Sequence, residues 1–312
     1  MSDKMRVGIL GTGYVAINNY LPILSGMDDV EVAAILSGHI ENAQKAAKRF
    51  GAVKAVSTIE ELVDEGIDCA FVLTPKGLHF EHVSFLLDKG IPTYCEKPLA
   101  TDLRDARELA RMSEATNTML MVGFNRRFAP VVQAAKEVWG DTSPDVIITQ
   151  KNRPETEYHA TLENAVHMVD ILRFFGGEAR EVHALAKYSD PDYETFTTAM
   201  IEFECGSSGM LIANRSAGQW EETIEMHGGN KTVIVNMPES LTVIDKDKKT
   251  TVEMTPLNMG WAKSEERMGF SNATAYFIDC VRNGTMPKPD AADAVLTHEL
   301  LDKILEDAGL PR

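Results

Sequence analysis

The chain has 312 residues, enough for two hydrophobic cores, and its 44% hydrophobic and 25% charged residues are typical of a globular protein. Acidic residues outnumber basic ones by 47 to 31, and the net charge of −16 argues against nucleic acid or an anionic membrane as partner. With no signal peptide and no bilayer-length apolar run, we expect a cytoplasmic protein. The four cysteines are far apart and form no Cys-x-x-Cys pair, so we expect free, buried thiols without a disulfide or metal site.

The first predicted element is a strand at 5–10 that runs into a glycine-rich turn at 11–16 and then a helix to residue 25. Gly11 permits the tight turn, Gly13 lets the backbone approach a pyrophosphate, and Ala16 lets the helix pack on the strand. A glycine pattern alone is weak, and an ordinary strand–helix turn is the alternative. The flanking strand and helix favour dinucleotide binding by Gly11, Thr12, Gly13, Tyr14 and Val15.

The second predicted strand, 30–37, leaves the choice of cofactor open. The acid that bonds the adenosine ribose in NAD-binding sites is expected at its tip, but the tip reads Ser37-Gly38-His39. Ser37 suits either a ribose hydroxyl or a 2′-phosphate, and His39 or Lys45 is placed to assist with a phosphate. The sequence therefore predicts NAD or NADP without choosing between them.

Strands and helices continue to alternate up to residue 124. The pattern predicts helices at 42–50, 59–64, 79–89 and 102–116, and strands at 54–57, 68–73, 91–95 and 118–124. Such alternation is typical of right-handed crossovers and a doubly wound parallel sheet. Thr74-Pro75 and Glu96-Lys97-Pro98 then fall at carboxyl ends of strands, on the edge where such sheets bind ligands. From the residues alone, Lys97 is as well explained as part of a surface Glu–Lys pair.

These motifs resemble those of the Gfo/Idh/MocA oxidoreductases, which include glucose–fructose oxidoreductase and inositol dehydrogenases. The resemblance rests on the glycine turn, Thr74-Pro75 with His79, Glu96-Lys97-Pro98-Leu99-Ala100, and Gly123-Phe124-Asn125-Arg126-Arg127-Phe128, in that order. It implies a nicotinamide-dependent dehydrogenase, usually of sugars or polyols, with the lysine beside nicotinamide and substrate. We add to the expected cofactor site Thr74, Pro75, His79, Glu96 and Lys97.

A predicted helix at 161–175 carries the second group of candidates. Glu163, His167 and Asp170 fall at i, i+4 and i+7, and a histidine flanked by carboxylates suits acid–base chemistry. The residues alone favour a structural His–Asp pair. The family resemblance makes His167 the expected proton acceptor, with Glu163 in place of the usual aspartate and without the usual glycine-rich lead-in. Arg126 and Arg127 are expected to contact substrate or cofactor, or else to form interdomain ion pairs, and Asp170 is a further loose substrate candidate.

From residue 181 the pattern predicts short strands separated by turns, at 182–187, 195–204, 210–216, 222–227, 231–236 and 241–244, and closing helices at 271–282 and 291–308. The segment 254–268 is predicted to be irregular. Consecutive strands without helices indicate an antiparallel sheet. The expected fold is a Rossmann-type domain at 1–124 and, at 125–312, an α+β domain with a large open, mostly antiparallel sheet. The resemblance implies a homodimer or homotetramer formed through that sheet.

The resulting hypothesis is a two-domain NAD(P)-dependent oxidoreductase. Hydride passes between nicotinamide and a hydroxyl or keto carbon of a sugar, polyol or related molecule, with Lys97, His167 and Glu163 as catalytic residues. A cofactor-binding sensor without turnover is the alternative. Lys97 and His167 would be dispensable in a sensor, so their joint presence favours an enzyme. A third possibility is an enzyme of this fold that holds its cofactor permanently.

Overall fold

The structure, a computed structural model, describes residues 4–154, 159–188 and 193–310. The chain divides into two compact units. The first combines Met1–Phe124 with Phe270–Val295, and the second combines Asn125–Gly269 with Leu296–Arg312. The sequence-based division has the same break after residue 124, but it assigned Phe270–Val295 to the second domain.

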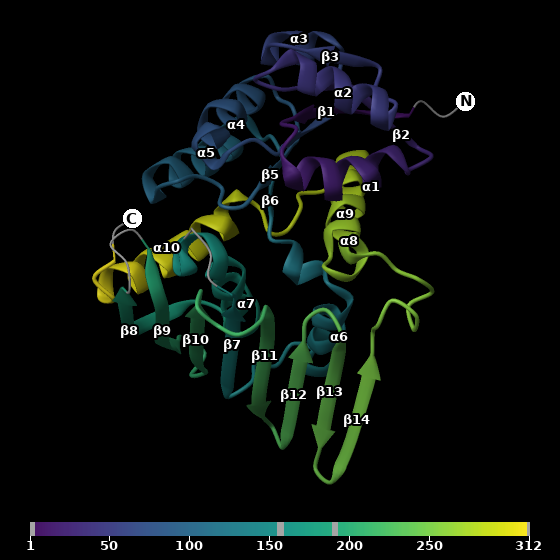
Figure 1. Cartoon of the computed structure of the whole chain (residues 1–312). Coiled ribbons are helices and arrows are strands. Elements are labelled where there is room, and N and C mark those ends of the chain that lie inside the picture. Colours follow the sequence, from purple (N-terminus) through teal and green to yellow (C-terminus); the bar gives the residue numbers. More distant parts are fainter. Residues whose placement is uncertain (1–3, 155–158, 189–192, 311–312) are drawn as a thin grey trace. The chain divides into compact units, whose positions relative to one another are not determined.

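The sheet of the first unit is parallel and six-stranded, in the order β3-β2-β1-β4-β5-β6 (Figure 1). The order reverses beside β1, so the carboxyl ends of β1 and its neighbours meet where doubly wound sheets bind ligands. The strands are β1 (Met5–Leu10), β2 (Val30–Leu36), β3 (Lys54–Val56), β4 (Cys69–Val72), β5 (Thr93–Glu96) and β6 (Leu120–Gly123).

Helices connect these strands, and their ends follow capping rules. The Thr58 and Asp102 side chains accept backbone N–H groups at the starts of α3 and α5, and Gly51 ends α2 in the left-handed conformation. The helices are η1 (Ala16–Tyr20, π-helical), α1 (Leu21–Ser25), α2 (Ile40–Phe50), α3 (Ile59–Asp64), η2 (Lys76–Leu78), α4 (His79–Asp88) and α5 (Leu103–Thr116).

Helix α9 (Phe270–Asn283) belongs to the first unit because of its aromatic residues. The Phe277 ring packs edge-on against Phe71 and Tyr94, with centroids 5.4 and 5.6 Å apart, and the Phe270 ring lies 5.5 Å from Tyr20. These contacts join segments about two hundred positions apart in the chain. The periodicity of α9 predicts a helix, but it does not specify which core the helix covers.

The second unit contains an eight-stranded sheet in the order β14-β13-β12-β11-β7-β10-β9-β8. Every pair is antiparallel except β7 with β10, so the prediction of a mostly antiparallel second sheet is confirmed. Its strands are β7 (Val146–Asn152), β8 (Ala179–Tyr188), β9 (Glu194–Phe203), β10 (Ser208–Asn214), β11 (Glu221–Gly228), β12 (Lys231–Asn236), β13 (Ser240–Asp245) and β14 (Lys248–Glu253).

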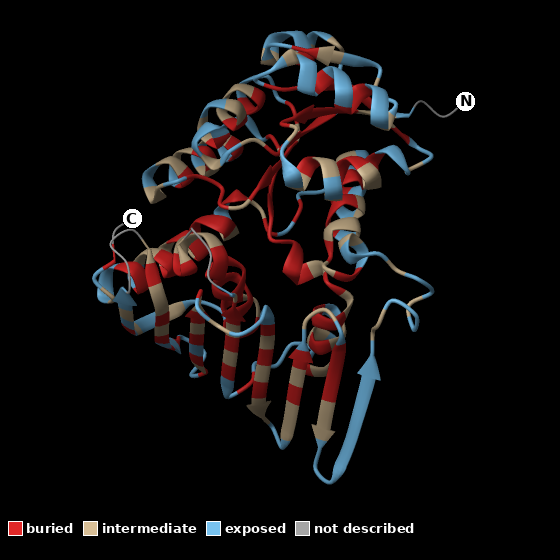
Figure 2. Ribbon diagram, in the orientation of Figure 1, coloured by how far each residue is buried: buried red, intermediate tan, exposed pale blue. Residues whose placement is uncertain are grey.

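Edge strand β14 was not predicted from the sequence. All six of its residues are exposed, as Figure 2 shows, so it lacks the alternation that marks a half-buried strand. It forms because β13 offers a free edge. The remaining helices are η3 (Asn125–Phe128), α6 (Pro130–Trp139), η4 (Ala160–Ala165, π-helical), α7 (Val166–Gly176), α8 (Ser264–Arg267) and α10 (Ala291–Asp307).

The predicted helix at 161–175 is present, but its first part is the π-helical η4. The Asn164 N–H bonds the His159 carbonyl five residues back, rather than four. A π-helical turn changes the angular spacing, so Glu163 and His167 do not keep the expected i, i+4 relation of a regular helix. Helix α7 then packs on β7 and β10 and is almost wholly buried.

Candidate functional site

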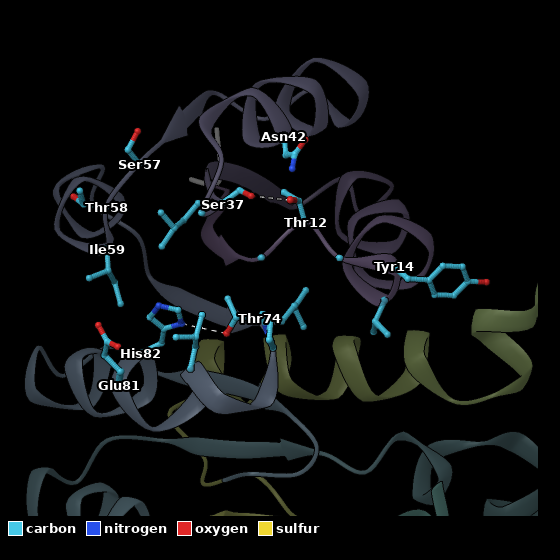
Figure 3. Close-up of a pocket in the computed structure, with 18 of the residues that line it drawn as sticks. Thr12, Tyr14, Ser37, Asn42, Ser57, Thr58, Ile59, Thr74, Glu81 and His82 are labelled. Atoms are coloured by element: carbon cyan, nitrogen blue, oxygen red, sulfur yellow. Dashed lines mark hydrogen bonds between the residues drawn. The ribbon is translucent and has the colours of Figure 1, made fainter. Parts of the chain in front are cut away.

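A cavity of about 820 Å³ lies at the carboxyl ends of β1, β2 and β4 in the first unit (Figure 3). Eight of the residues predicted to bind cofactor line it: Gly11, Thr12, Gly13, Tyr14, Val15, Ser37, Thr74 and Pro75. The prediction missed further lining residues that come from the loops and first turns of α2, α3 and α4: Asn42, Ser57, Thr58, Ile59, Glu60, Leu78, Glu81 and His82. Polar residues just after β3 are the sequence signal that would have found Ser57 and Thr58, whereas the other six lie within helices.

The glycine turn has the geometry that a dinucleotide requires. Gly11 has φ +107°, and a Cβ there would lie 2.6 Å from the carbonyl oxygen of Leu73, so only glycine fits. A Cβ at Gly13 would meet no atom within 4 Å, so the backbone there borders open space. The residues present therefore fit a pyrophosphate that approaches the backbone at Gly13.

Two hydroxyl groups mark the end of the cavity near β2. The hydroxyls of Thr12 and Ser37 lie 2.9 Å apart, and Ser37 is buried. On the opposite side, the Thr74 hydroxyl lies 3.1 Å from Nδ1 of His82. Burial lowers the pKa of His82. The Tyr14 ring is 80% exposed and extends away from the other labelled side chains. The cavity therefore offers neutral hydrogen-bonding groups close to its glycine turn.

His79, another predicted cofactor residue, is buried behind this edge. Its Nδ1 lies 2.8 Å from the Pro98 carbonyl oxygen and its Nε2 lies 2.9 Å from the Thr74 carbonyl oxygen. Both partners are backbone carbonyl oxygens, so each ring nitrogen faces an acceptor. His79 thus connects the loop after β4 with the loop after β5.

Glu96 and Lys97 follow at the end of β5. The buried Glu96 carboxylate accepts the Tyr20 hydroxyl at 2.5 Å and the Lys97 backbone N–H at 3.0 Å. Burial raises the Glu96 pKa, although Lys97, the Tyr20 bond and His79 oppose the increase. The Lys97–Pro98 peptide bond is cis. Glu96 therefore anchors the backbone of Lys97, with both of its oxygens engaged by the protein.

In the second unit, His167 lies in the first turn of α7 and is buried. One turn later, Asp170 accepts a bidentate ion pair from Arg127 at 2.7 and 2.6 Å, and a third bond from the Thr297 hydroxyl at 3.1 Å. Glu163 accepts the His159 backbone N–H at 3.1 Å, at the start of η4. The structure thus brings Arg127 and Asp170 together within one unit, on the helix that carries His167.

A second buried cluster surrounds Glu222 on β11. Arg126 binds its carboxylate with two bonds of 2.9 Å, Lys151 Nζ lies 2.8 Å away, and Trp220 donates at 3.0 Å. Burial opposes ionisation of Glu222, but Lys151 and Arg126 outweigh it and hold its pKa well below the usual range. Burial, together with Arg126 and Arg153, lowers the pKa of Lys151 well below its usual range. Lys151 and Glu222 were not predicted as site residues.

Lys97 belongs to the first unit, whereas His167 and Glu163 belong to the second. Among the described residues no group of three or more His, Cys, Asp or Glu side chains is arranged to hold a metal ion. In the same part of the chain, no helix combines the length and the hydrophobicity needed to cross a membrane. Three cysteines are buried as expected, but Cys205 is exposed.

Two family models match successive segments of the chain. A model described as an oxidoreductase family with an NAD-binding Rossmann fold (GFO_IDH_MocA) matches residues 5–124. The GFO/IDH/MocA C-terminal domain matches residues 134–234. Together the two matches cover most of the chain.

Individual proteins match over nearly the full length. YceM of Salmonella typhimurium is 28% identical, with 97% of this chain and 98% of that protein covered. Inositol 2-dehydrogenase of Rhizobium meliloti is 24% identical, with 99% and 98% covered. Among solved structures, an Agrobacterium radiobacter oxidoreductase in complex with NAD⁺, L-tartaric acid and magnesium has a TM-score of 0.88 at 21% identity, covering 99% of this chain and 97% of that one.

Proposed function

Because the chain belongs to the Gfo/Idh/MocA oxidoreductase family, with an NAD-binding Rossmann fold, we propose that it is a dehydrogenase acting on a CH–OH group of a sugar, polyol or related small molecule. The observation that carries the proposal is the cavity beside the glycine turn, at the sheet edge where Rossmann folds bind dinucleotides. The substrate class follows relatives such as D-apiose dehydrogenase of Paraburkholderia graminis, 22% identical over 96% of this chain and 86% of that protein.

Three residues carry the proposed chemistry. The bound nicotinamide would supply the hydride acceptor or donor. His167 takes the proton from the substrate hydroxyl, Lys97 bonds the reacting oxygen, and Glu163 supports them electrostatically. His167 suits this role because an imidazole gains or loses a proton near neutral pH. Lys97 suits its role because Glu96 and His79 fix the backbone on either side of it.

Arg126, Arg127 and Asp170 have a positioning role in this proposal. Each arginine is buried and forms a bidentate pair within the second unit, with Glu222 or Asp170. The Asp170 pair holds α7 at the turn next to His167. The Arg127–Asp170 pair therefore orients the proton acceptor.

Fluorescence titration with NADH and NADPH tests the cofactor site, and the reduced-nicotinamide absorbance with a panel of sugars and polyols tests turnover. We expect Lys97→Ala and His167→Ala each to lower kcat/KM by at least about a hundredfold. Exposed Lys89 provides a matched control as Lys89→Ala, which is expected to keep activity. Full activity in both site variants would overturn the catalytic assignment, whereas cofactor binding without turnover would favour the sensor.

We also propose a cytoplasmic homodimer or homotetramer whose subunits meet through the eight-stranded sheet. The support is apolar residues on its outer face: Leu185 is 73% exposed on β8, and Met200 on β9 is 56% exposed. Light scattering after size-exclusion chromatography measures the mass. Leu185→Glu with Met200→Glu should lower it to that of one chain, and an unchanged mass would place the interface elsewhere.

A further inference from the structure

We infer that the cofactor is NADP(H) rather than NAD(H), and that Lys45 and Arg49 on α2 bind its 2′-phosphate. The inference rests on the proposed function, because it presumes a nicotinamide dinucleotide in the cavity at the glycine turn. It names the residues that distinguish the two cofactors, which differ only in this phosphate.

The first unit contains a second, smaller cavity of about 280 Å³. Thr12 and Asn42 line both cavities, so the smaller one adjoins the larger at the Thr12–Ser37 hydroxyl pair. In Figure 3 the Asn42 side chain extends from α2 toward this pair. In a Rossmann fold the adenosine ribose lies at the tip of the second strand, which is where Ser37 stands. A group on the ribose 2′ position would therefore face the smaller cavity.

The helix presents its cations on the side of this cavity. Asn42, Lys45 and Arg49 fall at i, i+3 and i+7 of α2 and all line the smaller cavity. The Arg49 guanidinium stacks on the Phe50 ring at 4.7 Å, which restricts its rotamers. An amide, an ammonium and a guanidinium on one face are donors suited to phosphate oxygens.

The charges around the ribose position also favour a phosphate. Lys45 and Arg49 form no ion pair within the described part of the chain. The tip of β2 offers the Ser37 hydroxyl where NAD-binding sites place a carboxylate for the 2′-hydroxyl. The two carboxylates of the larger cavity, Glu60 and Glu81, come from α3 and α4, and neither lines the smaller cavity. The smaller cavity is thus lined by two positive charges and no negative one.

Binding measurements test the inference without any need for a substrate. The wild-type chain is titrated with NADPH and NADH by fluorescence, and 2′,5′-ADP and 5′-ADP are used as competitors. We expect NADPH to bind at least about tenfold more tightly than NADH, and 2′,5′-ADP to compete better than 5′-ADP. Lys45→Met and Arg49→Met should each weaken NADPH binding about tenfold while NADH affinity stays within about twofold.

Lys48→Met is the matched control, because Lys48 is an exposed cation of the same helix that lines neither cavity. It should leave both affinities unchanged, and circular dichroism checks that every variant folds. Equal binding of NADH and NADPH would overturn this inference and leave the proposed function standing. Equal weakening of both cofactors in Lys45→Met would also overturn it, since that indicates general attraction of phosphates. Binding of neither cofactor would overturn the proposed function as well.

Discussion

The sheet edge of the first unit and the buried ion pairs of the second unit hold their polar groups in opposite ways. At the edge, the glycine turn, two hydroxyls and short loops border an open cavity. In the second unit, Arg126 and Arg127 are buried in bidentate pairs with Glu222 and Asp170. The edge therefore leaves its hydrogen-bonding groups available to a ligand, whereas the second unit pairs these charges within the protein.

This difference has energetic consequences. A glycine turn fails when a substitution introduces a side chain that does not fit. A neutral hydroxyl can face solvent with little loss of free energy. A buried ion pair fails when one partner is removed, because the other charge remains desolvated. Substitutions in the buried ion pairs of the second unit should therefore mainly affect folding, whereas several at the sheet edge of the first unit should mainly affect binding.

The largest effect is expected from Arg127→Ala. Asp170 has no exposed surface and would lose its bidentate cationic partner, so the free energy of unfolding should fall by about 3–5 kcal/mol. The midpoint of urea denaturation measures this change. Arg104→Ala, which removes an 85% exposed arginine from a surface pair with Asp105, should hardly move the midpoint. Equal shifts for both variants would contradict the comparison.

The glycine turn should respond differently at its two glycines. Gly11→Ala puts a Cβ against the Leu73 carbonyl at positive φ, so we expect a loss of about 2–3 kcal/mol in stability. Gly13→Ala meets no atom in the protein, so stability should stay the same while NADPH affinity falls at least about tenfold, because the methyl group occupies the space of the pyrophosphate. Denaturation and cofactor titration separate the two, and a stable, binding-competent Gly11→Ala variant would refute the assigned turn geometry.

Substitution of His79 tests whether the sheet edge of the first unit depends on the two hydrogen bonds of this buried side chain. His79→Phe leaves the Thr74 and Pro98 carbonyls without their partner, which should cost about 1–2 kcal/mol of stability. If His79 also positions Lys97, His79→Phe should lower kcat more than it changes KM. His79→Gln, whose side-chain amide carries two N–H bonds, should restore part of the lost kcat. A loss of stability with unchanged kcat would leave His79 with a structural role alone.

The smallest effect is expected from Lys151→Met. Glu222 keeps its bidentate Arg126 partner, and methionine fills a similar volume, so stability near neutral pH should change by less than about 1 kcal/mol. Because the folded pKa of Lys151 lies below the unfolded value, the unfolded chain binds more protons between the two values and wild-type stability should rise with pH there. Denaturation at several alkaline pH values should show this rise, and its persistence in Lys151→Met would assign it to another group.

The parts of the site that could be predicted are local in sequence. The glycine turn, Ser37, Thr74-Pro75 and Lys97 each follow a strand whose apolar run is visible in the chain, and parallel strands bring their carboxyl ends to one edge. Asn42 and His82 were missed because they lie within helices, where only the direction of the side chain decides whether a residue faces the cavity.

The sequence alone is therefore enough to predict the alternation of strands and helices, the parallel first sheet, the turn-rich second one and the motifs at the strand ends. These depend on periodicity and on glycine geometry, which act over a few residues. Three features depend on tertiary packing: α9 returns to the first unit, β14 completes the second sheet, and Arg126 pairs with Glu222, 96 positions away. Such pairings depend on which surfaces meet when the core closes, and no local pattern encodes the partner of a buried charge.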